Sequence, residues 1–281
     1  MALPFLFMGV RGRRRSAVRW PGQALALLLT VVLFLFQAKQ AAGGALERAM
    51  LGKSQIVDLT HTVGERAFLP AGQERARPEA SGEGDGSSNS QRLPSSGELD
   101  THLSLPASVL KGKPTVATMP PRDLLAHAVV VDIAAKVAEA ADYRGTVEDL
   151  KAWERRNGRI PKGSVVLFYT GWARRWNDPA RYLNLDAQGV ARVPGISPGA
   201  AAFLVGERDI HGVGVDSYVP KVVPGPQGGE GASRHLLYAG KWQLSNLVNL
   251  DRLPSKGTKL VVAPLRLDAG SAPARVIAIL P

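Results

Sequence analysis

Short apolar runs of strand length recur along the chain and are separated by polar segments. The runs AVVVDI at 128–133 and SVVLFYTGW at 164–172 are almost uninterrupted, which is typical of strands buried on both faces. Strands are also predicted for four further segments that contain β-branched residues: SQIVDLTHTV at 54–63, IHGVGVD at 210–216, KLVVAPLRL at 259–267 and ARVIAIL at 274–280.

Four segments with helix signals lie between these strands. The clearest is TVEDLKAWERRNG, where Thr146 can cap the helix start, Asp149 completes a capping box and Gly158 ends the helix. The others are PPRDLLAH at 120–127, SPGAAAFLVGER at 197–208 and ASRHLLYAG at 232–240. Helices and strands mix without a strict βαβ repeat or any internal repeat. The sequence therefore predicts an α/β or α+β fold around a mixed sheet.

The composition changes sharply between Ala71 and Ser96, where Gly, Ser, Glu and Pro dominate. Such a segment cannot bury enough apolar surface to offset the entropy lost on ordering. We therefore expect a flexible, disordered insertion at 71–96 within a globular domain that spans residues 50–281.

The first 45 residues have the order of a secretory signal peptide or a signal anchor. A cluster of arginines precedes an apolar run at 24–37, and small residues follow from Ala41 to Ala45. The run is shorter than the ~20 residues that usually span a bilayer. We expect cleavage near Gly43 and export to the periplasm or the extracellular space. The alternatives are an anchor through residues 24–37, which would make the protein a membrane-anchored scaffold, and a true start at Met50.

The composition suits one globular domain with a tail, because 45% of the 281 residues are hydrophobic and 21% are charged. The net charge is +11, but residues 1–50 hold seven Lys/Arg against Glu47, which leaves +5 for the rest. No basic face is interleaved with aromatic residues, so we expect no nucleic-acid partner, and membrane contact only through the N-terminal segment. The chain has no cysteine, so any metal must be held by His, Asp or Glu.

The motif GISPG, from Gly195 to Gly199, matches the G-x-S-x-G pattern of serine hydrolases. The residue after the nucleophile must donate its backbone N–H to the oxyanion hole, and here it is Pro198, which has none. Ser197 as a helix N-cap with proline at the first helical position explains the same letters. The motif therefore indicates a helix start.

The chain has five histidines, and a single histidine is more often structural than a ligand. His127 and His211 border apolar strands and are expected to be structural. His61 ends a predicted strand, and its role stays open. His102 and His235 are the candidates for chemistry, for the reason given next.

From Ser54 to the C-terminus, about four fifths of its length, the chain resembles the Putative cyclase family of metal-dependent hydrolases, which includes bacterial kynurenine formamidase and isatin hydrolase. The matching blocks occur in family order. They are IVDLTH, DTHLSLPAS, PPRDLLAHAVVVDI, GSVVLFYTGWARRW, PGISPGAAAFLVGERDIHGVGVDS, RHLLYAGKWQLSNLVNLDRLP and VVAPLRLDAGSAPARVIAIL. The resemblance implies a barrel-like mixed sheet wrapped by helices and a homodimer or higher homo-oligomer.

The metal motif of that family, His-x-Gly-Thr-His-x-Asp-x-Pro-x-His, is kept only in part. Thr101, His102 and Pro106 keep the pattern, and His235 matches a later family histidine. Five positions depart from it: Glu98 replaces the first His, Asp100 the Gly, Ser104 the Asp, Ser108 the final His, and Ser245 a Glu that precedes an Asn-Leu pair.

This partial match leaves two hypotheses about function. The first is a hydrolase of non-peptide C–N bonds, arylformamidase-like, with zinc or manganese on Glu98, His102 and His235 and with Asp100 as an acid–base group or extra ligand. Serine is a poor zinc ligand, so Ser104, Ser108 and Ser245 count as lost ligands. The second is an inactive binding or structural paralogue that has no metal. Either one would bind a small molecule.

Overall fold

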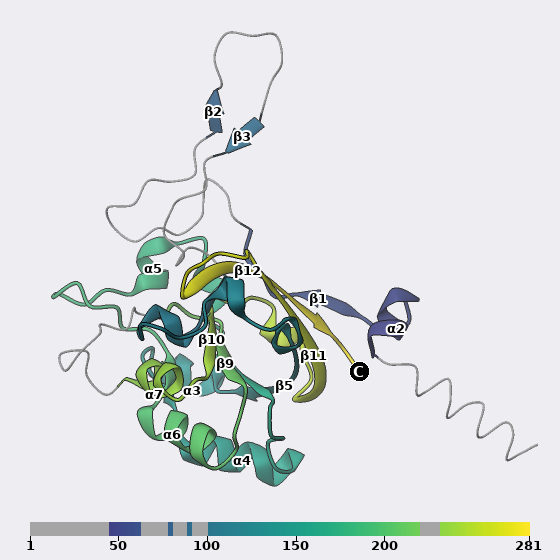
Figure 1. The fold of residues 1–281 in the computed structure, drawn as a ribbon. Coiled ribbons are helices and arrows are strands. Elements are labelled where there is room, and N and C mark those ends of the chain that lie inside the picture. Colours follow the sequence, from purple (N-terminus) through teal and green to yellow (C-terminus); the bar gives the residue numbers. More distant parts are fainter. Residues whose placement is uncertain (1–44, 63–77, 81–88, 92–100, 220–230) are drawn as a thin grey trace, which may run out of the picture. The chain divides into compact units, whose positions relative to one another are not determined.

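The computed structural model describes residues 45–62, 78–80, 89–91, 101–219 and 231–281 (Figure 1). The expected signal segment, Glu98 and Asp100 lie outside these residues, as does most of the expected insertion at 71–96. Within the insertion, β2 (Pro78–Ala80) and β3 (Asn89–Gln91) pair antiparallel. No helix of the described residues is long and apolar enough to cross a membrane.

A mixed sheet of eight strands forms the centre of the domain. Its order is β1-β12-β11-β5-β7-β9-β10-β4, and β12 also pairs with β4, so seven strands close into a barrel-like ring. β5, β7, β9 and β10 run parallel, and the other pairs are antiparallel. The strands are β1 (Ile56–Asp58), β4 (His102–Ser104), β5 (Leu125–Asp132), β7 (Val165–Tyr169), β9 (Gly212–Val215), β10 (Trp242–Ser245), β11 (Lys256–Pro264) and β12 (Ser271–Ile279).

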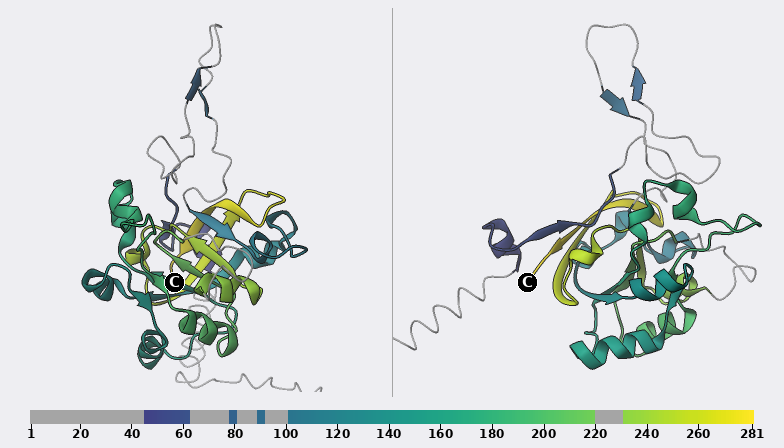
Figure 2. Two further views of the ribbon diagram at one scale, coloured as in Figure 1. Left: turned by 90° about the vertical axis from the view of Figure 1, so that its left-hand side faces the viewer. Right: turned by 180° about the vertical axis from the view of Figure 1, so that it is seen from behind.

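Helices and short turns surround this ring (Figure 1 and Figure 2). The α-helices are α2 (Ala45–Met50), α3 (Ala134–Glu139), α4 (Val147–Asn157), α5 (Pro179–Leu183), α6 (Pro198–Gly206) and α7 (Ala232–Tyr238). The 3₁₀ turns are Pro106–Ser108, Val116–Thr118, Pro121–Leu124, Trp172–Arg175 and Leu250–Arg252. A small parallel ribbon joins β6 (Arg144–Gly145) to β8 (Gly195–Ile196). This arrangement confirms the predicted mixed α/β fold with a barrel-like core.

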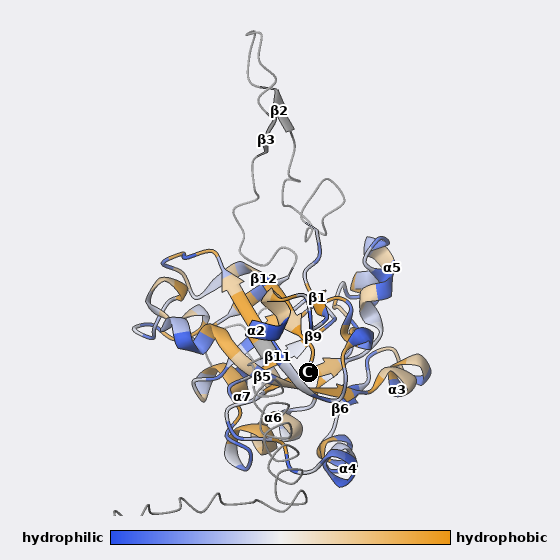
Figure 3. Cartoon of the chain, turned by 90° about the vertical axis from the view of Figure 1, so that its right-hand side faces the viewer, coloured by the Kyte–Doolittle hydropathy of each residue, from blue (hydrophilic) through white to orange (hydrophobic). Residues whose placement is uncertain are grey.

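Alternation along the strands divides the apolar side chains between two cores. Leu103, Leu167 and Leu244, for example, pack together inside the ring. The outward-facing Val129 and Phe168 pack instead with residues of α4 and α6. Figure 3 shows the strands mainly in the hydrophobic colours and α4 largely in the hydrophilic ones, as expected for a helix that buries one narrow stripe.

Both helix starts that the sequence predicts in detail are confirmed. The Thr146 side chain accepts a hydrogen bond from the Asp149 N–H, the Asp149 carboxylate accepts one from the Thr146 N–H, and Gly158 follows the last turn of α4. Ser197 Oγ accepts a hydrogen bond from the Ala200 N–H at 3.1 Å, so GISPG is an N-cap.

The prediction of a helix over 120–127 is wrong in its second half. A 3₁₀ turn covers Pro121–Leu124, and strand β5 begins at Leu125, which is paired with Val261 of β11. Pairing along the sheet supplies more backbone hydrogen bonds than one further helical turn would. β4 and β10 were not predicted as strands, because each is short and carries polar residues.

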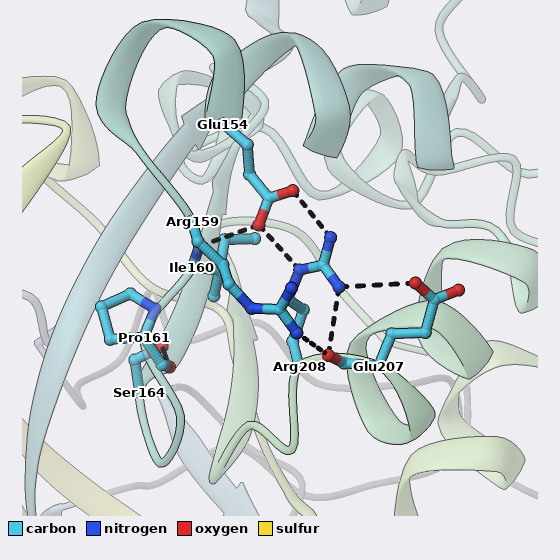
Figure 4. Close-up of polar contacts among 7 residues, drawn as sticks. All are labelled: Glu154, Arg159, Ile160, Pro161, Ser164, Glu207 and Arg208. Carbon is cyan, nitrogen blue, oxygen red and sulfur yellow. Dashed lines mark hydrogen bonds and ion pairs between the residues drawn. The ribbon is translucent and has the colours of Figure 1, made fainter.

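A semi-buried ion pair joins α4 to the end of α6 (Figure 4). Arg208 Nε and Nη2 donate to the two carboxylate oxygens of Glu154 at 2.7 and 2.8 Å. Oε1 of Glu154 also accepts a hydrogen bond from the Ile160 N–H at 2.8 Å. These hydrogen bonds lower the pKa of Glu154, the largest contribution coming from Arg208. The pair fixes the two helices against each other through a geometry that a lysine could not reproduce.

Candidate functional site

Polar residues follow three neighbouring parallel strands at the point where each strand ends. Thr170 follows β7, Asp216 follows β9 and Asn246 follows β10. Thr170 Oγ1 donates to Asp216 Oδ1 at 2.6 Å, and the Gly171 N–H donates to Oδ2 at 2.9 Å. Because the carboxyl ends of parallel strands share one edge of the sheet, these residues form a buried polar cluster there.

Asp216 is almost fully buried within this cluster. Burial raises the pKa of its carboxyl to about 6, although hydrogen bonds from Thr170 and Gly171 act in the opposite direction. These donors fix the carboxylate on the loops after β7 and β9. We assign Asp216 the role of holding this edge of the sheet together.

Asn246 connects the cluster to the other side of the site. Its Oδ1 accepts a hydrogen bond from the Tyr182 hydroxyl at 3.0 Å, and its backbone carbonyl accepts one from Thr101 Oγ1 at 2.6 Å. Burial raises the pKa of Tyr182, so its hydroxyl stays protonated and acts as a donor. Asn246 also has a positive φ of 53°, a conformation that asparagine adopts more readily than most residues.

His61 is buried beside Thr101, although the sequence left its role open. Its backbone N–H donates to Thr101 Oγ1 at 3.0 Å, and its ring stacks on Trp176 with 3.8 Å between centroids and 10° between planes. Burial lowers the pKa of the imidazole to about 4. In the described part of the chain its Nε2 atom has no hydrogen-bond partner. His61 is therefore a neutral imidazole with one unused polar atom next to the predicted motif.

His102 and Ser245 face each other across the antiparallel pair of β4 and β10. They are direct register partners, and Ser245 Oγ lies 2.9 Å from His102 Nε2. Both are buried, with exposed fractions of 3% and 2%. The structure therefore brings together two of the residues that the sequence singled out.

The other aligned serines have different surroundings. Ser104 lies two residues after His102 on the same face of β4, opposite Gln243 of β10. Ser108 Oγ donates to the Leu105 carbonyl at 2.7 Å, within the 3₁₀ turn. Ser104 thus shares the face of His102, whereas the hydroxyl of Ser108 is engaged by the backbone.

His235, the expected later ligand, is exposed on α7. Ser233, two residues earlier, lines a cavity that Gln243 also lines, and His235 does not line it. Of the two histidines expected to be structural, His211 packs edge-on against Trp242, and His127 is exposed on β5.

That cavity lies over the outward face of β9 and β10 and has a volume of about 230 Å³. Val213 and Val215 form its floor. The start of α7, the residues after β9 and the β6–β8 ribbon complete its walls. Gln243 lies two residues before Ser245 on the same face of β10, whereas His102 and Ser245 themselves do not line the cavity.

A divalent metal needs at least three good protein ligands in most catalytic sites. In the described ranges, no group of three or more His, Cys, Asp or Glu side chains is close enough to hold a metal ion. Ser245, whose neutral hydroxyl is a weak metal ligand, stands opposite His102. The described residues do not fit a metal site, and no chemical step is assigned to a metal.

Comparison with known proteins gives a consistent family. The family model described as Putative cyclase matches residues 57–220. An isatin hydrolase of Roseibium aggregatum is 32% identical over 190 residues, which cover 64% of this chain and 71% of that protein.

Solved structures extend the similarity to the fold. Isatin hydrolase A from Ralstonia solanacearum is 31% identical with a TM-score of 0.71, over 87% of this chain and 97% of that one. An isatin hydrolase bound to the product analogue thioisatinate is 26% identical with a TM-score of 0.72, over 87% and 99%. A predicted metal-dependent hydrolase from Bacillus stearothermophilus, 22% identical with a TM-score of 0.58 over 80% and 98%, shares the fold.

Proposed function

The chain belongs to the Putative cyclase family and is related to isatin hydrolase, and on that premise we propose that it hydrolyses a small aromatic amide in an arylformamidase-like reaction. One observation carries the proposal: the buried His102–Ser245 pair lies on the same face of β4 and β10 as Gln243, which lines a cavity of about 230 Å³, enough room for a single-ring compound. The family supports the reaction class, and this geometry supports the proposed location of the chemistry.

In the proposed reaction His102 acts as the base. Water attacks the amide carbonyl and forms the new C–O bond, and its proton passes to His102 Nε2, directly or through the Ser245 hydroxyl 2.9 Å away. The C–N bond then breaks, and His102 returns the proton to the leaving nitrogen. The products are a carboxylic acid and an amine, and no other reactant is needed.

The metal ligands implied by the resemblance, Glu98, His102 and His235, are not needed for these steps. We also propose Asp100 as an acid–base group, which would add a second proton donor. Metal content is therefore a measured outcome of the experiment below.

A second candidate function is small-molecule binding without turnover. It is favoured by one observation, the hydroxyl of Ser245 in the place where the resemblance expects a carboxylate facing His102. The same cavity would serve that function.

The two candidates differ in turnover. The protein is prepared without chelator or His-tag, its metal content is measured, and hydrolysis of formanilide, N-formylkynurenine and isatin is followed for wild type and His102→Ala. The proposal expects turnover that falls at least ~10²-fold in the variant, since a positioned base contributes about that much. Ser197→Ala, at a helix cap, is the control and should keep full turnover. Binding of these amides with no turnover in wild type would favour the second candidate.

A further inference from the structure

The side chain of Gln243 lines the cavity over β9 and β10. Gln243 is only 6% exposed and lines the cavity, and in the part of the chain that the structure describes its side chain makes no hydrogen bond. A primary amide has two donors and an acceptor, and those of Gln243 are available to a molecule in the cavity. Gln243 is therefore placed to pair with a ligand that offers a carbonyl or an amide edge.

The charged side chains among the described residues that line the cavity have one sign. Among the described residues that line it, Arg144 and Arg234 are charged, and none is Asp or Glu. Arg144 lies on the rim, where a Cβ added to Gly195 would be 3.6 Å from its Nη1 atom. Among those residues it has no acidic partner. Arg144 is exposed, so its guanidinium is free to reach a carboxylate at the mouth of the cavity and to bind it through charge-assisted hydrogen bonds.

Arg234 adds a second cation at the start of α7. Its guanidinium lies 4.4 Å from the centre of the Tyr238 ring, one helical turn further on. This contact holds the side chain along the helix. The remaining floor and walls, with Val193, Val213, Val215 and Val219, are apolar and suit a flat ring.

We propose that this cavity selects small aromatic ligands that carry a carboxylate, with the carboxylate at Arg144 and a carbonyl at Gln243. The inference rests on the proposed function in one respect, because it names the substrate class of that site. The preferred substrate is then an aromatic amide acid and not its neutral analogue.

The test uses two ligands that cannot be hydrolysed and differ only in the carboxylate, 2-acetylbenzoate and acetophenone. Isothermal titration of the full-length protein should give at least ~10-fold tighter binding of 2-acetylbenzoate, since only this ligand can form a charge-assisted hydrogen bond with Arg144. Arg144→Gln should remove this preference and leave the binding of acetophenone unchanged. Gln243→Leu, which keeps the bulk of the side chain, should weaken both ligands. Arg155→Gln, on the exposed side of α4, is the matched control and should change neither.

Equal binding of the two ligands, no binding of either, or an unchanged preference in Arg144→Gln would overturn the inference. Failure of the proposed function gives a different result. If wild type binds 2-acetylbenzoate preferentially but does not hydrolyse formanilide, the site stands and the hydrolase proposal does not. If formanilide is hydrolysed but the carboxylate brings no preference, the hydrolase proposal stands and the inference about the carboxylate does not.

Discussion

Ser245 Oγ lies 2.9 Å from His102 Nε2, across a direct register pair of β10 and β4. Ser104 is the next residue of β4 on the same face. A carboxylate at position 245 would therefore face the imidazole, and one at position 104 would lie on the same face of the sheet. In the part of the chain that the structure describes, no two further His, Asp or Glu side chains join His102 to make a three-ligand metal site.

Carboxylates at positions 104 and 245 should create a metal site together with His102. In the double variant Ser104→Asp with Ser245→Glu, two carboxylates join His102, which makes three ligands of the kind that zinc prefers. We expect about one zinc per chain by elemental analysis after dialysis against buffered zinc. The two single variants are the controls and should hold far less. Equal zinc in wild type would show that the ligands lie elsewhere.

His61 should make the protein less stable in acid. Its pKa is about 4 in the folded chain against 6.5 for the free side chain, so below pH 6.5 the unfolded state binds the proton more readily. Above pH 6.5 the free energy of unfolding is unaffected, and it decreases by up to about 3 kcal/mol as the pH falls through 4. The measurement is urea unfolding at several pH values between 7.5 and 4.

His61→Phe, which keeps the stack on Trp176, isolates this effect. Asp216, with its pKa raised to about 6, favours the folded state at low pH and loses that contribution as the pH rises from 3.8 through 6. Because both proteins contain Asp216, its contribution cancels in the difference between them. A difference that does not change with pH would mean that His61 titrates normally.

Glu154→Gln should destabilise the fold on the order of 3 kcal/mol. The change leaves the Arg208 guanidinium, whose side chain is 9% exposed, with only the 65% exposed carboxylate of Glu207, 3.4 Å away, as a counter-charge. The comparison variant is Lys162→Gln, which breaks the pair between Lys162 and Asp209, where Lys162 is 82% exposed. Thermal unfolding should shift clearly for the first variant and hardly at all for the second. Similar shifts would show that burial of the Arg208 pair contributes little.

Gly214→Ala should destabilise the barrel, whereas Gly206→Ala should not. An added Cβ at Gly214 would lie 2.6 Å from Leu167 Cδ2 and 2.8 Å from Leu247 Cδ1, so the core would be overpacked by about 1–3 kcal/mol. At Gly206, the last residue of α6, nothing lies within 4 Å, and alanine should stabilise by about 0.5–1 kcal/mol. Chemical denaturation measures both. A Gly214→Ala variant that is as stable as wild type would mean that β9 can shift.

Elements that follow local rules can be predicted from the amino-acid order alone. The capping box of Thr146 and Asp149, the cap at Ser197 and the runs of β5 and β7 are encoded within a few neighbouring residues. The order of the blocks also indicates the family and, through it, the barrel-like sheet. Because each of these signals is contained in a short stretch of chain, the sequence is sufficient to identify them.

Which side chains meet depends on long-range packing. His102 and Ser245 are 143 residues apart and become neighbours because the ring closes through β4. His61 has the sequence context of any strand-end histidine, and only its burial against Trp176 leaves Nε2 without a partner among the described residues. Gln243 and Arg144 show no motif at all, and the stacking of α7 and the β6–β8 ribbon over β9 and β10 gives them a common cavity. Register, burial and tertiary contacts set these relationships, and no window of neighbouring residues contains them.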